Sequence, residues 1–177
     1  CLLPPTVSSD LTLTAGVDYL MEGRVTVGNG NGQLETNGDG TLADGSSVRN
    51  VTLTIDPGVK VLGKTGTFAN LVITRGSKLM AMGTQSAPIV FSSDDEGLDG
   101  SGEWGGLIMH GYAPHNECSE GGSYCDIDSE GESGFAGGYD PNDSSGVLRY
   151  VVVAEGGYEF STGNEINGIS LVAVGSG

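Results

Sequence analysis

The sequence predicts an all-β solenoid, in which short strands form coils that stack along one axis. The first observation is an internal repeat: residues 54–63 align with residues 72–81 at an offset of 18 positions (72 − 54), with Gly58 and Gly76 at the same place in both copies. The second is the glycine content, 32 of 177 residues, which indicates many tight turns. The third is that no segment sustains the apolar period of about 3.6 residues that a helix requires.

The repeat favours a solenoid over a β-sandwich. A sandwich predicts turns without register between copies, whereas stacked coils place the same corner residue at the same offset. Each copy here reads as a strand, a corner at glycine and a second short strand. We therefore expect a repeat of about 20 residues that buries its apolar face by stacking on the next one.

The segments around the repeat extend this pattern. Residues 10–27 contain two alternating apolar stretches separated by Ala15 and Gly16, which predicts two strands joined by a turn. Polar, turn-rich sequence at residues 28–47 and 113–145 predicts two inserted loops. The length predicts one domain, residues 1–177. Four later segments predict further short strands: APIVFSS, WGGLIMHG, VLRYVVVAEGG and INGISLVAVGSG.

The charge balance argues against one class of partner. The chain has 7 Lys and Arg against 23 Asp and Glu, a net charge of −16 at pH 7. Such a surface repels phosphate backbones and anionic lipid headgroups, so nucleic acid is not an expected partner. Because the aliphatic runs are shorter than the ~20 residues of a spanning helix, we expect membrane contact only through a lipid anchor.

Five segments together resemble a family of secreted parallel β-helix proteins from Gram-negative bacteria, which are often lipoproteins and have no assigned catalysis. They are LTIDPGVKVLG, LVITRGSKLMAMGTQSAPIVFSS, GEWGGLIMHGYAP, SGVLRYVVVAEGG and NEINGISLVAVGSG, within residues 53–177. The resemblance implies a right-handed parallel β-helix that is extracellular or on the outer cell surface. Members usually continue beyond VGSG. The chain is therefore expected to be the N-terminal part of a longer solenoid, or to leave a last coil on which another copy could stack head to tail.

The three cysteines fit an exported protein. Cys118 and Cys125 lie seven positions apart (125 − 118) in a Gly- and Ser-rich loop, and no further ligands complete a zinc site, so we expect a disulfide. Cys1 remains, in the sequence CLLPP that cleavage of a lipoprotein signal would leave. Lipidation and intermolecular pairing are the two functional interpretations of Cys1, and a fragment boundary is the third.

Two acidic, glycine-rich segments are candidate calcium sites, because carboxylate oxygens on flexible loops suit this ion. The alternative is a solvated acidic face. The second segment begins like an EF-hand loop, but Gly137 stands at the twelfth position in place of the bidentate glutamate. The candidate ligands are Asp94, Asp95, Asp99 and Glu103 in the first segment, and Asp126, Asp128 and Glu130 in the second.

An enzyme is the rival class, because parallel β-helices also include polysaccharide lyases and glycoside hydrolases. A lyase would need a base that takes a proton from the substrate. The candidates are Lys60, Arg75 and Lys78, which could form a row of basic side chains on stacked corners. The alternative is that they are outward polar residues that cover the coil. A hydrolase would need paired carboxylates held on neighbouring coils. His110 and His115, near Cys118, are weak candidates for a transition-metal site.

Aromatic residues are the candidates for glycan contact. Trp104 lies inside an apolar run, which favours core packing, and the adjacent Gly105 and Gly106 then indicate a close approach of another backbone. The remaining candidates are Tyr112, Tyr124, Phe135 and Tyr139.

The function expected from these observations is that of a non-catalytic surface protein, structural, adhesive or self-assembling as a filament subunit. A polysaccharide-binding module is the first alternative, and a polysaccharide-cleaving enzyme is the second. Expected partners are further copies of the chain or surface glycans. The sequence requires no cofactor, and calcium is the one that its acidic loops would suit.

Overall fold

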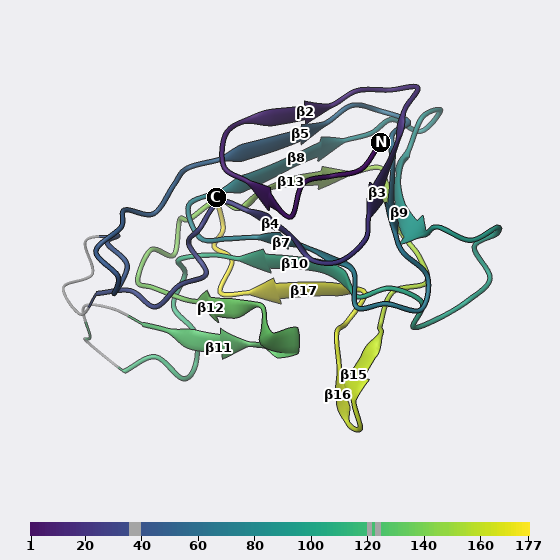
Figure 1. Cartoon of the computed structure of the whole chain (residues 1–177). Helices are drawn as coiled ribbons and strands as arrows, with labels where there is room; N and C mark the ends of the chain where they lie inside the picture. The colour runs from purple at the N-terminus through teal and green to yellow at the C-terminus, as the bar shows by residue number, and fades with distance from the viewer. Residues whose placement is uncertain (36–39, 120–121, 123–124) are drawn as a thin grey trace.

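The computed structural model describes residues 1–35, 40–119, 122 and 125–177, and these residues form strands with almost no helix (Figure 1). Three parallel sheets make up the body of the molecule. The first sheet consists, in spatial order, of β1 (Thr6–Val7), β4 (Val25–Val27), β7 (Asn70–Ile73), β10 (Gly106–His110) and β17 (Ile169–Val172).

The other two sheets contain four strands each. The second sheet consists of β2 (Leu11–Leu13), β5 (Thr52–Ile55), β8 (Lys78–Met82) and β13 (Gly146–Arg149). The third consists of β3 (Asp18–Met21), β6 (Lys60–Gly63), β9 (Ile89–Ser93) and β14 (Val151–Val153).

The order of the strands shows that the chain winds as a parallel β-helix. It passes through the first, second and third sheets in turn, as β1, β2 and β3, then β4, β5 and β6, then β7, β8 and β9, and then β10, β13 and β14, before β17 returns to the first sheet. Every pairing within the three sheets is parallel. The predicted fold class is confirmed.

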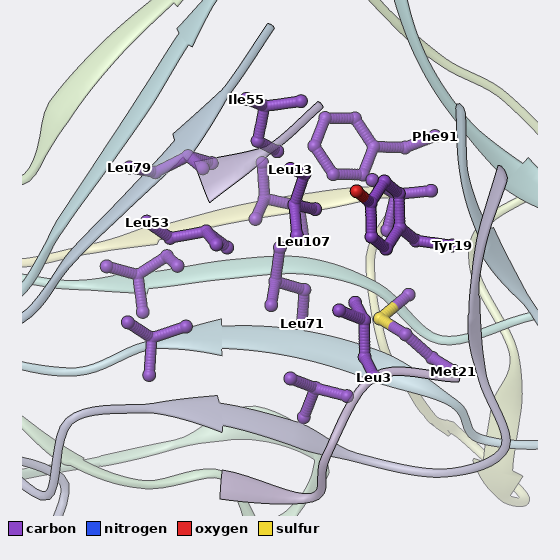
Figure 2. Packing of buried hydrophobic residues seen from close by; sticks show 14 of the residues in the cluster. Leu3, Leu13, Tyr19, Met21, Leu53, Ile55, Leu71, Leu79, Phe91 and Leu107 are labelled. Atoms are coloured by element: carbon purple, nitrogen blue, oxygen red, sulfur yellow. The ribbon is translucent and has the colours of Figure 1, made fainter. Parts of the chain in front are cut away.

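Alternate residues of each strand point into the coil and stack on their counterparts in the next coil. Leu53 of β5 is in register with Leu79 of β8, and Val61 of β6 with Phe91 of β9; all four side chains are buried. Figure 2 shows this column of apolar side chains between the sheets. Each fully buried side chain of this size stabilises the fold by roughly 1.5–3 kcal/mol.

The predicted coil length is wrong. Leu53 pairs with Leu79, an offset of 26 (79 − 53), and Val61 with Phe91, an offset of 30 (91 − 61). The 18-residue repeat instead matches the corner between β5 and β6 with the corner between β7 and β8, which lie on different sides of successive coils. What repeats is turn chemistry: Gly58 and Gly76 have φ values of 83° and 77°, a conformation that favours glycine.

Two long segments and one short ribbon leave the coil. Residues 28–47 lie between β4 and β5, and residues 113–145 lie between β10 and β13. The second excursion contains β11 (Ile127–Ser129), the 3₁₀ turn η1 (Glu130–Glu132) and β12 (Gly134–Ala136). A ribbon of β15 (Glu159–Ser161) and β16 (Asn164–Glu165) separates β14 from β17. None of the helical segments in the described ranges is long and apolar enough to cross a membrane.

Trp104 belongs to the core, as expected. Its side chain is buried, and its indole N–H donates to the carbonyl of Ala154 at 2.7 Å. The two glycines that follow allow the predicted close approach. A Cβ atom on Gly105 would lie 2.9 Å from the carbonyl oxygen of Ala69, and one on Gly106 would lie 2.3 Å from that of Asn167.

Candidate functional site

The most concentrated group of acidic side chains lies at the corner where β9 and β14 end. One carboxylate oxygen from each of Asp95, Glu103 and Glu155 lies within 4.8 Å of the other two. Val153 of β14 is in register with Phe91 of β9. The residues two positions later, Glu155 and Ser93, therefore lie side by side where these two strands end. This is the only group of three or more potential metal-ligating side chains within the described ranges that is close enough to share an ion.

The three carboxylates converge on one hydroxyl group. The Oγ atom of Ser93 lies 2.6 Å from Asp95 Oδ1, 2.6 Å from Glu103 Oε2 and 2.9 Å from Glu155 Oε2. A serine hydroxyl has a single proton and can donate it to only one of these oxygens. The other two short contacts bring oxygen lone pairs together, an arrangement that a bound cation would stabilise.

Glu155 is the buried member of the group, with 6% of its surface exposed. Its Oε2 accepts a hydrogen bond from the backbone N–H of Ser93 at 3.1 Å, and its Oε1 accepts one from that of Asp99 at 3.0 Å. No ion pair joins these carboxylates to a basic side chain in the part of the chain that the structure describes. Hard oxygen ligands of this kind match calcium better than softer metals.

The structure therefore brings together two of the candidate calcium ligands, Asp95 and Glu103, with Glu155, which the sequence reasoning missed. The signal for Glu155 was an acidic residue directly after an apolar strand and directly before two glycines. Asp99 contributes its backbone N–H to Glu155. Asp94 accepts hydrogen bonds from the N–H and Oγ of Thr65, each at 2.7 Å, and these bonds lower the pKa of its carboxyl group.

The candidate ligands of the second acidic segment have separate surroundings. Asp126 forms an ion pair with Arg75 at 2.8 Å between Oδ1 and a guanidinium nitrogen. Asp128 and Glu130 are exposed and line a groove beside β17. Glu130 also accepts a hydrogen bond from the amide of Asn167 at 2.8 Å.

Arg75 lies on the outside of the coil, but the excursions bury it fully, so the expectation that it is a polar residue covering the coil towards solvent is wrong. Its guanidinium donates to the carbonyl of Gly30 at 2.7 Å in the first excursion and to that of Gly137 at 3.1 Å in the second. The prediction that the basic residues form a ladder is also wrong, because Lys60 belongs to β6 and Lys78 belongs to β8, in different sheets.

Arg24 holds the second excursion at another point. Its Nε donates to the side-chain oxygen of Asn70 at 3.0 Å, and its guanidinium donates to the backbone carbonyls of Gly131 and Glu132 in η1. Burial lowers the pKa of Arg24, and the charge of Glu132 opposes this shift. Arg24 and Arg75 thus fasten the excursions to the outer face of the first sheet.

His110 lies beneath the second excursion and is fully buried. Its Nε2 is 3.3 Å from the hydroxyl oxygen of Ser133. Burial, and then the charges of Arg75 and Arg24, lower its pKa to about 3, so the imidazole is neutral at physiological pH. His115 lies elsewhere, where its Nδ1 accepts from the N–H of Glu117 at 3.3 Å.

Cys118 and Cys125 form a disulfide, while Cys1 is exposed with a free thiol. The described aromatic candidates are engaged within the protein. The ring of Tyr112 lies 5.8 Å from the guanidinium carbon of Arg75, and the hydroxyl of Tyr139 donates to the carbonyl of Ser119. Phe135 is half-buried, and Tyr124 lies outside the described residues.

Comparison with known proteins identifies a family. A family model described as a pectate-lyase like beta helix domain matches residues 31–177. No curated protein and no solved structure matches the chain.

Proposed function

The chain belongs to the pectate-lyase-like beta helix domain family, and we propose that it is a non-catalytic structural scaffold. Its solenoid supplies the rigid body, and the excursions at residues 28–47 and 113–145 supply the surface that it presents. Members of one fold can differ in chemistry, because activity depends on the side chains of the site. The proposal therefore rests on how this chain uses its charged residues.

The burial of Arg75 is the observation that carries the proposal. A lyase needs a basic group that can reach a substrate proton. The guanidinium of Arg75 is instead enclosed, with Asp126 and backbone carbonyls of both excursions as its partners. Lys60 and Lys78 lie on different sheets and do not form a ladder with Arg75. This distribution supports a structural use of the basic residues.

In this proposal a calcium ion binds at one corner of the scaffold. The corner is formed by Ser93, Asp95, Glu103 and Glu155. The ion would bridge β9, the loop that follows it and the end of β14, which belong to successive coils. It would relieve the repulsion of carboxylates that share one hydroxyl proton. Calcium would then stabilise the stacked coils, because a metal that binds only the folded state adds its binding free energy to the stability of that state.

Location and assembly follow the same proposal. A disulfide-containing, strongly acidic solenoid suits the cell exterior, where thiols are oxidised. The exposed thiol of Cys1 is available for a lipid anchor or for intermolecular pairing. We place the scaffold outside the cell or on the outer surface of a Gram-negative bacterium, with surface glycans or further copies of the chain as neighbours.

An activity screen tests the scaffold role. Purified protein is incubated with neutral, uronic-acid and amino-sugar polysaccharides, with and without calcium, while unsaturated products and new reducing ends are measured. We expect both signals to stay at the level of a buffer blank. Turnover that disappears in the Glu155→Gln variant, while the far-UV circular dichroism of that variant is unchanged, would show that the corner is catalytic and contradict the proposal.

A further inference from the structure

Four asparagines of the chain are followed directly by glycine: Asn29, Asn31, Asn37 and Asn167. In such a pair the backbone nitrogen of the glycine can attack the side-chain amide of the asparagine, because glycine has no Cβ atom to hinder the approach. Asn37 lies outside the described residues. The other three pairs differ in how the fold holds the two groups that must meet.

The pair of Asn29 and Gly30 is held by three hydrogen bonds. The Nδ2 atom of Asn29 donates to the carbonyl of Ser47 at 3.1 Å, and its Oδ1 atom accepts from the N–H of Arg49 at 2.8 Å. The attacking group, the N–H of Gly30, donates to Oγ1 of Thr74 at 3.0 Å. The reaction would require all three bonds to break.

The pair of Asn31 and Gly32 is held by two hydrogen bonds. The Nδ2 atom of Asn31 donates to the carbonyl of Ser133 at 3.0 Å. The N–H of Gly32 donates to the carbonyl of Asn29 at 3.4 Å, which is a weaker contact.

The pair of Asn167 and Gly168 is held by one hydrogen bond. The Nδ2 atom of Asn167 donates to Oε2 of Glu130 at 2.8 Å. The N–H of Gly168 has no hydrogen-bond acceptor among the described residues. Its carbonyl accepts from Leu107 of β10 at 3.0 Å, and the N–H and C=O of one residue in an extended chain point to the same side, so this N–H faces β10. The attacking nitrogen is therefore free in this pair alone.

We propose that Asn167 is a site of spontaneous deamidation, which loosens the second excursion as the protein ages. The nitrogen of Gly168 forms a bond to Cγ of Asn167, and the bond from Cγ to Nδ2 breaks. The side-chain nitrogen leaves as ammonia, together with the proton of the Gly168 N–H. Water then opens the five-membered imide at one carbonyl to give aspartate, or at the other to give isoaspartate.

Either product changes the contact with η1. The new carboxylate at position 167 faces the carboxylate of Glu130, so a hydrogen bond is replaced by repulsion between like charges. Isoaspartate also adds a methylene group to the backbone where the carbonyl of Asn167 lies against Gly106. The 3₁₀ turn then loses its link to the segment that enters β17. This modification is independent of the scaffold role.

The test follows each pair during storage of the folded protein in mildly alkaline buffer. Peptide mass spectrometry measures the conversion of each asparagine, and enzymatic methylation measures isoaspartate. Asn167 should react at least about tenfold faster than Asn29, since each further hydrogen bond that must break slows the reaction by up to about this factor. In concentrated urea the three pairs should react at similar rates. Conversion of Asn29 or Asn31 as fast as that of Asn167 in the folded protein would overturn the proposal.

A glycine variant tests the chemical step. Gly168→Ala should slow the conversion of Asn167 at least about tenfold, because the added methyl group hinders the attacking nitrogen. The variant should fold like the parent protein, because a Cβ atom at Gly168 would meet no other atom within 4 Å. An unchanged rate in this variant would show that the nitrogen of Gly168 is not the attacking group.

Two asparagine variants test the consequence for the excursion. The amide of Ser133 donates to the carbonyl of Glu130 within η1 at 3.4 Å. Its hydrogen exchange should accelerate about tenfold in Asn167→Asp, which loses the bond to Glu130. Asn116→Asp places the same charge at an exposed position of the second excursion and should leave this exchange unchanged. Equal rates in the two variants would overturn the loosening of the excursion.

Discussion

Arg75 shows how burial changes the role of a charged residue. Its sequence context, between a strand and a glycine corner, is that of an outward polar side chain. In the fold, both excursions close over it, and its guanidinium satisfies carbonyls of Gly30 and Gly137 as well as the carboxylate of Asp126. Arginine suits this position because its rigid fork of donors can bind several segments at once.

Replacing Arg75 should therefore destabilise the protein strongly. Arg75→Met leaves Asp126 and the carbonyls without their partner, at a cost of roughly 3–5 kcal/mol in the free energy of unfolding. Urea unfolding followed by circular dichroism measures the loss. Arg49→Met, at an exposed arginine, serves as the control and should change the free energy by less than about 0.5 kcal/mol. Equal, small effects of both substitutions would refute the fastening role.

The lowered pKa of His110 predicts that the stability of the fold depends on pH. Its pKa is lowered from 6.5 to about 3 in the folded protein, so the unfolded chain binds more protons between these values. The stabilising contribution is complete above pH 6.5 and is lost as the pH falls towards 3. Arg24 and Arg75 add to the effect by disfavouring the imidazolium.

The His110→Gln variant isolates this contribution. Its melting temperature should decline less than that of the parent protein between pH 6.5 and pH 4, because glutamine does not titrate. The control is His115→Gln, in the second excursion and outside the buried layer that holds His110. Parallel pH profiles for the parent and the His110→Gln protein would show that His110 does not control acid stability.

The entry to β10 depends on two adjacent glycines. Gly106 has a φ of 132°, and its Cα faces the backbone of Asn167 and Gly168 in the next coil. Trp104, immediately before them, fills the core at the same level. The tryptophan and the glycine pair thus mark a place where three backbones meet.

Gly106→Ala should disrupt this junction. The added Cβ would lie 2.3 Å from the carbonyl oxygen of Asn167, and the backbone conformation is one that alanine rarely adopts. We expect a loss of about 3 kcal/mol or more in thermal or chemical unfolding. Gly23→Ala is the matched control and should be nearly neutral, because a Cβ added at Gly23 would meet no other atom within 4 Å. A neutral Gly106→Ala would mean that the coils at this level are not in contact.

Across the whole molecule, local signals in the sequence were more informative than long-range ones. The all-strand character, the glycine corners and the burial of Trp104 follow from neighbouring residues, and the structure agrees with each. The predicted coil length was wrong because the 18-residue match compares two different corners of successive coils and not the same corner. Alternation and turn chemistry can be read over a few residues, whereas stacking register cannot.

The corner site illustrates the same limit. Asp95 and Glu103 lie in one acidic loop and were predicted together. Glu155 joins them only because β14 stacks on β9, a contact between residues more than fifty positions apart (155 − 95). The ion pair of Arg75 and Asp126 was missed for the same reason. Contacts between charged residues of separate coils can be predicted only when the order in which the coils stack is known.

Thermal unfolding with and without calcium is the most direct test of the claim that the carboxylates serve the solenoid. Saturating calcium should raise the melting temperature of the parent protein by about 5 °C. Glu155→Gln should remove the increase, and Glu96→Gln, an exposed acid in the same loop, should keep it. An equal shift in all three proteins, or no shift in the parent protein, would contradict a structural cation site at this corner.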